Sequence, residues 1–204
     1  MEPTVDRSWD RILAWLAEHA PATLDQIAAP ASDDDIAAAR AAVGVDLPAD
    51  LVAWWRRANG SNPDAWGREC RLLPSFGPCG IEHALHSRRI WWQVWHDQGI
   101  ENGWLTEEDF TWAQAQPAGT HAGMWLRGFL PIAASSGGLD LIVDLRSGSE
   151  HGCVREFDRV FTDGKPRWAS VASMLADIAG ALENQGPIDG LRPYPTDKGT
   201  LEWD

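Results

Sequence analysis

The sequence predicts an α+β fold, and three observations lead to this prediction. Amphipathic segments with helical periodicity fill most of the first half of the chain. Segments rich in Leu, Ile, Val and Phe follow between residues 124 and 161. They are expected to be antiparallel strands, because short Gly-rich connections join them. One more amphipathic segment lies after them and predicts a closing helix.

Two helices are predicted near the start of the chain. Residues 8–19 place their apolar side chains on one stripe, with Ser8 as the expected cap. Pro21 ends this helix. The second helix begins at Ser32, where a capping side chain and the acidic first turn suit the helix dipole. Gly44 is expected to close it.

Two more helices are predicted in the middle of the chain. Pro48 presets the first turn of a helix that is expected to run to Ala58. Asn59 and Gly60 follow, a pair that readily takes the left-handed conformation needed at a helix end. Residues 81–95 have apolar side chains in a helical rhythm and are predicted to form the next helix.

Residues 97–123 form a Trp-rich insertion without a clean hydrophobic period. Several glycines, Pro117, an acidic triplet at residues 107–109, Trp104 and Trp112 lie in it. Long segments of this kind inside a compact domain are often functional. The insertion is therefore expected to be irregular and to be a candidate for function.

The strands and the end of the chain follow from local patterns. The predicted strands are residues 71–73, 124–133, 138–144 and 153–161. Residues 135–138 predict a hairpin turn rather than a phosphate cradle, because the Lys of a P-loop is missing. Residues 170–183 carry one apolar stripe and predict a closing helix. The Pro-rich tail, residues 186–204, is expected to be loosely held.

Composition and charge limit the classes of function. The 204 residues carry a net charge of -13, which repels nucleic acid and anionic lipid and favours encounter with a basic protein. The sequence has no apolar run of membrane-spanning length and does not open on a leader pattern, so a cytoplasmic protein is expected. Three cysteines, Cys70, Cys79 and Cys153, are expected to be reduced thiols.

Four motifs lie in a fixed order between residues 32 and 184. They are Leu47-Pro48, Trp54-Trp55 leading to Asn59-Gly60, a Leu-Pro-Ile strand around Pro131 followed by Gly138 to Asp144, and Gly152-Cys153-Val154 before the closing helix. The series resembles the SUKH superfamily, which includes the Smi/Knr fungal cell-wall regulators and many bacterial proteins encoded beside toxins. The helix 8–19, the insertion 97–123 and the tail 186–204 lie outside the compact family pattern.

The resemblance has implications for both fold and function. It implies a mixed, largely antiparallel sheet backed by several helices. The length of the chain independently predicts a single domain over residues 1–204. It implies no catalytic residues, and no cofactor is expected. Bacterial members commonly act as immunity proteins that bind and block a toxin. The acidic balance of the chain fits a basic toxin domain as the partner.

The candidate partner-binding residues are Trp104, Glu107, Glu108, Asp109 and Trp112. Thirteen tryptophans beside one tyrosine is an unusual composition, and Trp is enriched at protein-binding hot spots. Tryptophans in regular segments are expected in the core, namely Trp9, Trp15, Trp54 and Trp125. The acidic triplet alone fits a solvated turn. With the adjacent aromatic residues, it also fits an interface in which acidic side chains attract a basic partner and the tryptophans are buried on binding.

Two other polar clusters have simpler interpretations. Cys79, His83 and His86 share a helical face but lack a fourth ligand, which favours ordinary surface histidines over a zinc site. Asp140 and Asp144 share a strand face, but at about 3.3 Å per residue they lie about 13 Å apart, too far for shared acid-base work. No metal site is therefore expected.

Three functions compete on the sequence alone. An immunity protein would have one tight partner and no turnover. A regulatory scaffold like the fungal members would have several weaker partners and no toxin encoded beside it. An enzyme is least favoured, because no Ser-His-Asp, Cys-His or metal constellation has usable spacing. The immunity protein is the function that we expect.

Overall fold

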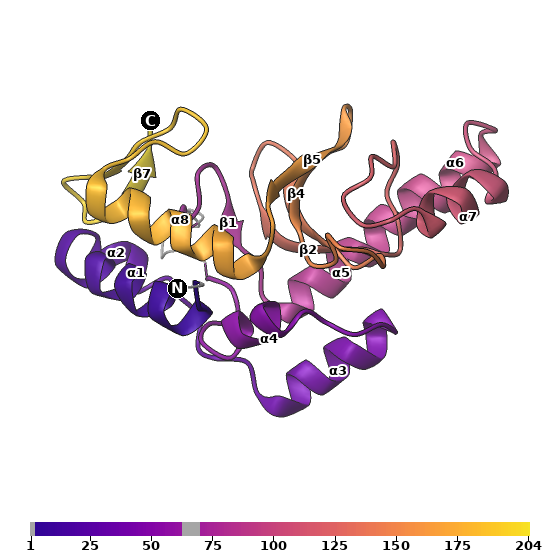
Figure 1. The fold of residues 1–204 in the computed structure, drawn as a ribbon. Helices are drawn as coiled ribbons and strands as arrows, with labels where there is room; N and C mark the ends of the chain where they lie inside the picture. The colour runs from indigo at the N-terminus through magenta and orange to yellow at the C-terminus, as the bar shows by residue number, and fades with distance from the viewer. Residues whose placement is uncertain (1–2, 63–69) are drawn as a thin grey trace.

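The structure is a computed structural model that describes residues 3–62 and 70–204. A five-stranded sheet lies in the middle of the fold, in the order β1-β2-β3-β4-β5 (Figure 1). Its strands are β1 (Gly77–Pro78), β2 (Phe129–Ala134), β3 (Leu139–Asp144), β4 (Val154–Asp158) and β5 (Thr162–Trp168). The α+β prediction is confirmed. Each pair of neighbouring strands is antiparallel, so the described residues contain no parallel pair of a mixed sheet.

Five helices pack on one another or on neighbouring helices and contribute side chains to the first core, which covers one face of the sheet. They are α1 (Val5–His19), α2 (Pro21–Leu24), α3 (Asp33–Val43), α4 (Ala49–Trp55) and α8 (Val171–Asn184). Figure 1 shows α1 and α8 running along the same side of the molecule. Leu141 and Val143 of β3 point into this core, together with Trp9 and Trp54. The expected burial of these two tryptophans is confirmed, whereas Trp15 is only half-buried.

The opposite face of the sheet carries a helical lobe and a second, aromatic core. Helix α5 (Ile81–Trp92) continues through the π-helix η1 (Gln93–Asp97) into α6 (Gln98–Glu101), and α7 (Glu107–Ala115) follows. Phe129, Phe157 and Trp125 are fully buried here, on the sheet face to which Ile142 also belongs. The alternation along β3 therefore separates the two cores. We call η1, α6, α7 and the segment up to residue 123 the lobe, which lies at the right of Figure 1.

The predicted caps of α3 are observed at both of its ends, whereas the predicted cap of the first helix is not. At the start of α3, Ser32 Oγ accepts a hydrogen bond from Asp35 N at 3.1 Å, and the Asp35 carboxylate accepts one from Ser32 N at 2.9 Å. Gly44 closes this helix with φ of 77°. Both predictions are confirmed. Ser8, the expected cap of the first helix, instead lies buried inside α1, which already begins at Val5.

Other predicted boundaries are also corrected. Helix α4 ends at Trp55 rather than at Ala58. Residues 71–73 form no strand, and only an isolated bridge joins Leu73 to Phe76. The expected strand 124–133 begins at Phe129, and the edge strands β1 and β5 were not expected as separate strands. The hairpin turn at 135–138 is confirmed by the hydrogen bond from Ser135 N to Leu139 O.

The chain end is docked, which contradicts the expected loose tail over residues 186–204. Strands β6 (Pro193–Pro195) and β7 (Leu201–Trp203) form a two-stranded hairpin. Leu201 and Trp203 are buried in the first core. Trp203 Nε1 donates a hydrogen bond to Arg71 O at 3.1 Å, and Leu201 N donates to Thr23 Oγ1 at 2.8 Å. The tail is therefore a structural part of the fold.

Candidate protein-binding site

The outward surface of the lobe displays two large aromatic side chains. Trp104 and Trp112 are 75% and 62% exposed, whereas Phe110 and Ala113 on the inner side of α7 are buried. Glu108 lies one helical turn before Trp112, so these two side chains are neighbours on the outward side of α7. We call Trp104, Glu108 and Trp112 the lobe surface.

The expected irregular insertion is in fact partly helical, and the acidic triplet is the first turn of α7. Thr106 is its N-cap, because Thr106 Oγ1 accepts from Asp109 N and the Asp109 carboxylate accepts from Thr106 N at 2.8 Å. Acidic groups near a helix N-terminus are stabilised by the helix dipole. These hydrogen bonds lower the pKa of Asp109, so it stays ionised. The pattern of Thr106 followed by Asp109 was the sequence signal for this helix.

The three acids of the triplet have different roles. Asp109 caps α7, and Glu107 Oε2 lies 3.2 Å from His96 Nε2. Glu108 is exposed and has no hydrogen bond or ion pair to any residue that the structure describes. All three carboxylates remain at the surface, but Glu108 is the one available to a partner at no cost in internal contacts.

His96 clamps α7 onto η1. Its ring stacks on Trp92 with centroids 4.3 Å apart and contacts Phe110 at 4.9 Å. Its Nδ1 lies 2.8 Å from Asp97 Oδ1, and its Nε2 faces Glu107. Partial burial lowers the pKa of His96, but its hydrogen bonds to the two carboxylates outweigh burial, and the net effect raises the pKa.

The free energy of unfolding is expected to depend on His96 in a defined pH range. Because the folded-state pKa is raised, the clamp contributes fully below the ordinary histidine value of about 6.5 and is lost as the pH rises through the raised value. Urea unfolding should show about 0.5 kcal/mol more stability near pH 6 than near pH 8.5 from this group. His96→Gln should remove that component, whereas the control His86→Gln on α5 should retain it. An unchanged pH difference in His96→Gln would exclude the clamp.

A buried ion network fixes the far end of the lobe to the sheet. Its side chains, Asp144, Arg146, Arg155 and Asp163, are 0% exposed. Asp144 Oδ2 lies 2.7 Å from Arg146 Nη2 and 3.0 Å from Arg155 Nη1, and Arg155 also pairs with Asp163. Burial alone would raise the pKa of Asp144, but hydrogen bonds from Arg146 and the backbone lower it. Charges buried without water need such compensation.

The same network binds the backbone of the lobe directly. Thr120 O accepts hydrogen bonds from Arg146 and Arg155, and Gly119 N donates to Asp144 Oδ2 at 2.9 Å. The backbone N–H groups of residues 122 and 123 donate to the Asp163 carboxylate. The sequence did not predict this network, although it placed Asp140 and Asp144 on one strand face. Asp140 accepts a hydrogen bond from Trp91 Nε1 at 2.7 Å and so ties α5 to the same face.

The residues of the four family motifs lie outside the lobe and have structural roles. Asn59 Oδ1 accepts a hydrogen bond from Ile81 N at 2.8 Å and so caps the start of α5. Gly60 has φ of 81°, and a Cβ there would lie 2.1 Å from Gly80 N. Leu47, Trp54 and Trp55 are buried, Pro48 precedes α4, Pro131 lies in β2 and Gly138 in the β2–β3 turn. These residues therefore shape the fold rather than a site.

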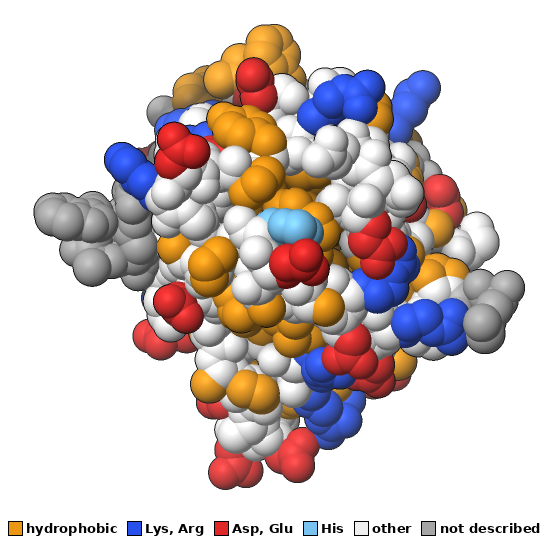
Figure 2. Space-filling view, turned by 90° about the vertical axis from the view of Figure 1, so that its left-hand side faces the viewer, with side chains coloured by type: hydrophobic (Ala, Val, Ile, Leu, Met, Phe, Trp, Pro, Cys, Tyr) orange, Lys and Arg blue, Asp and Glu red, His pale blue; other side chains and the backbone are white. Residues whose placement is uncertain are grey.

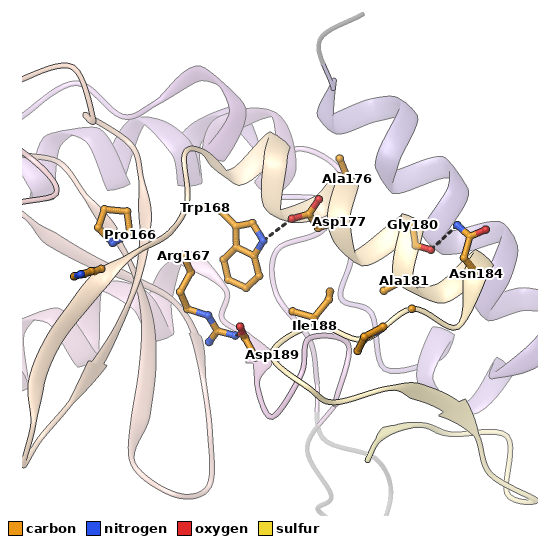
Figure 3. A pocket seen from close by; sticks show the side chains of 13 residues that line it. Pro166, Arg167, Trp168, Ala176, Asp177, Gly180, Ala181, Asn184, Ile188 and Asp189 are labelled. Atoms are coloured by element: carbon orange, nitrogen blue, oxygen red, sulfur yellow. Dashed lines mark hydrogen bonds and ion pairs between the residues drawn. The ribbon is translucent and has the colours of Figure 1, made fainter.

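A groove of about 720 Å³ lies between the end of β5, α8 and residues 186–189 (Figure 3). Trp168 Nε1 donates to Asp177 Oδ2 at 3.0 Å, Asn184 Nδ2 donates to Gly180 O, and Arg167 pairs with Asp189. Its polar side chains are thus largely engaged with one another. The groove presents no converging acid, base and nucleophile of the kind that catalysis requires.

The thiols and histidines also fail to form a reactive centre. The three cysteines are free and buried, as expected. Burial raises the pKa of Cys70 to about 11 and that of Cys153 to about 12, which keeps both thiols protonated. Within residues 3–62 and 70–204, no group of three His, Cys, Asp or Glu side chains could hold a metal ion.

The end of the molecule opposite the lobe has a different surface. Figure 2 looks at this end and shows hydrophobic side chains around a histidine, with acidic and basic side chains interspersed around them. Half-buried Leu13, Trp15 and Leu24 belong to the helices at this end. A surface of mixed sign does not steer a charged partner, so the lobe surface is the better candidate.

Comparison with known proteins identifies the family. In the described ranges, no helix is long and apolar enough to cross a membrane. A search of curated proteins found no match. The sequence model of the SMI1 / KNR4 family (SUKH-1) matches residues 30–177, from the segment before α3 to the middle of α8. The chain therefore belongs to the SMI1 / KNR4 family (SUKH-1).

Proposed function

We propose that this chain is an immunity protein that binds and neutralises a basic toxin domain through the lobe surface. The observation that carries the proposal is the exposure of two tryptophans on the lobe: Trp112, which neighbours Glu108 on α7, and Trp104, which precedes that helix. Exposed tryptophans are unfavourable in a free protein and are the commonest anchors of protein interfaces. A partner would bury them and regain that free energy.

Charge and rigidity support the same proposal. The net charge of -13 speeds association with a basic surface, and Glu108 adds a local acidic contact. The His96 clamp at one end of the lobe and the Asp144 network at the other hold α7 in place before binding. Preorganisation of this kind reduces the entropy lost on association.

The proposed mechanism needs no chemistry in this chain. SUKH domains are generally not enzymes, and family membership supports a non-catalytic domain. Inhibition would follow from covering the active site or substrate path of the toxin. The proposed place of action is the cytoplasm, where the immunity protein would meet its toxin.

Binding to a candidate basic toxin domain, chosen from the genes that neighbour the one for this chain, tests the proposal. Titration calorimetry with the full chain should give one toxin domain per chain. Trp104→Ala with Trp112→Ala should weaken binding by about 100-fold or more, because two anchors are truncated. Glu108→Lys should slow association, most strongly at low salt. Glu18→Lys, an exposed acid on α1 at the opposite end, is the matched charge control.

The outcomes separate the proposed function from the alternatives. Tight binding that survives the tryptophan substitutions would move the interface away from the lobe surface. Absence of binding by the wild-type chain, with several weaker partners instead, would favour a regulatory scaffold and reject the immunity function.

A further inference from the structure

The tip of the β4–β5 hairpin exposes two adjacent apolar side chains. Val160 is 71% exposed and Phe161 is 81% exposed. With Arg159 they connect β4 to β5: Val160 lies two residues beyond the end of β4, and Phe161 lies immediately before β5. Solvated hairpin turns are ordinarily built from Gly, Asn, Asp and Ser, so an apolar pair at this position is not explained by turn formation.

The tip is held in one conformation by its own backbone contacts. Asp158 Oδ1 accepts hydrogen bonds from Val160 N at 2.6 Å and from Phe161 N at 3.1 Å. Thr162 has φ of 65°, which a β-branched residue rarely adopts. Strain of this kind persists only where the surroundings enforce it, and it is concentrated at binding and switch sites.

Both strands below the tip are fixed in the interior. Phe157 is fully buried in the second core, and Asp163 is buried in the ion network. Arg159 lies over the β2–β3 turn, where a Cβ on Gly138 would approach its Nη2 to 2.0 Å. The hairpin therefore presents the apolar pair on a rigid support.

We infer that Val160 and Phe161 are a second anchor, which inserts into an apolar pocket of the same protein partner that binds the lobe surface. The hairpin and the lobe share a support, because the Asp163 carboxylate accepts backbone hydrogen bonds from Ala122 and Gly123. Figure 1 shows the tip and the α6–α7 connection on the same, upper side of the molecule. Both therefore project from the same side of the fold in this view. This inference rests on the proposed function.

The charge of the chain favours one kind of binding partner for Val160 and Phe161. Residues 158–165 contain two acids and two cations, and one of the acids, Asp163, is buried. The tip therefore lacks the cluster of cations that holds apolar loops at anionic membranes. A second copy of the chain would bring another net charge of -13 to the same place. A basic protein with an apolar pocket complements both the net charge of the chain and the exposed apolar pair.

Calorimetry of three full-length variants against the candidate basic toxin domain tests the inference. Val160→Ser with Phe161→Ser should weaken binding by about tenfold or more without changing the melting temperature, because both side chains are solvated in the free protein. Tyr194→Ser, which alters an exposed side chain on β6, is the matched control and should bind like wild type. Trp104→Ala reports on the lobe surface alone.

The calorimetry results either support the second anchor or reject it. Weaker binding by the tip variant and not by Tyr194→Ser supports the second anchor. Unchanged binding by the tip variant, with a loss in Trp104→Ala, overturns the anchor and leaves the proposed function standing. No binding by the wild type removes both. Wild-type sedimentation with vesicles of anionic phospholipid, or self-association abolished by Phe161→Ser, would assign the tip to a different occupant and overturn the inference.

Discussion

Asp144→Ala is expected to lower the free energy of unfolding by about 3–5 kcal/mol, since it leaves Arg146 and Arg155 buried without their shared carboxylate. The backbone at Gly119 also loses its acceptor. The lobe would therefore loosen together with the sheet. Urea denaturation followed by circular dichroism measures this change, because the secondary structure of the whole chain contributes to the signal.

An exposed ion pair supplies the control for this effect. Asp33 pairs with Arg56 at 2.8 Å, but its side chain is 85% exposed. Asp33→Ala should cost less than about 1 kcal/mol. If Asp144→Ala were as mild as Asp33→Ala, the network would not hold the lobe. Because the folded-state pKa of Asp144 is lowered, its contribution should be present above the ordinary Asp value of about 3.9 and be lost in stronger acid.

Trp203→Ala should have a comparable effect at the other end of the molecule, about 3–5 kcal/mol. Its indole is buried in the first core and donates a hydrogen bond to Arg71 O. Truncation would leave a cavity and an unpaired carbonyl group. Thermal and urea unfolding of the variant should both shift, with Tyr194→Ala in the same hairpin as the control because that side chain is 44% exposed. Equal stability of the two variants would mean that the tail is not docked in solution.

The capping residues of α3 led to a correct prediction, whereas α7 was not predicted although it has the same kind of cap. Ser32 was recognised from its capping side chain and from the three acids in the first turn that follows it. Thr106 and Asp109 form the same kind of capping box, but α7 has nine residues and buries only Phe110 and Ala113. An inward stripe that short does not produce a detectable period. The exposed Trp112 further obscured it.

The docked tail and the ion network depend on contacts that sequence patterns do not specify. Leu201 and Trp203 alternate with an acidic residue, but a three-residue strand is too short for that alternation to stand out. Arg155 meets Asp144 only because the β3–β4 register pairs Ile142 with Arg155. Charged residues in strands ordinarily face solvent, so their burial could not be expected from composition.

The candidate site was predictable in its residue types but not in its geometry. Trp104 and Trp112 were chosen as candidate anchors, and the structure leaves both exposed. The acidic triplet was expected to act together, yet Asp109 caps the helix and Glu107 faces His96, which leaves Glu108 for a partner. Only the helical phase of α7 separates these roles.

Growth rescue is the measurement that tests the central claim most directly. The candidate basic toxin domain is induced in bacteria that carry either the wild-type chain or the variant Trp104→Ala with Trp112→Ala, at equal protein levels. We expect the wild type to restore growth and the variant to fail. Continued toxicity in the presence of folded wild-type protein would contradict the immunity function.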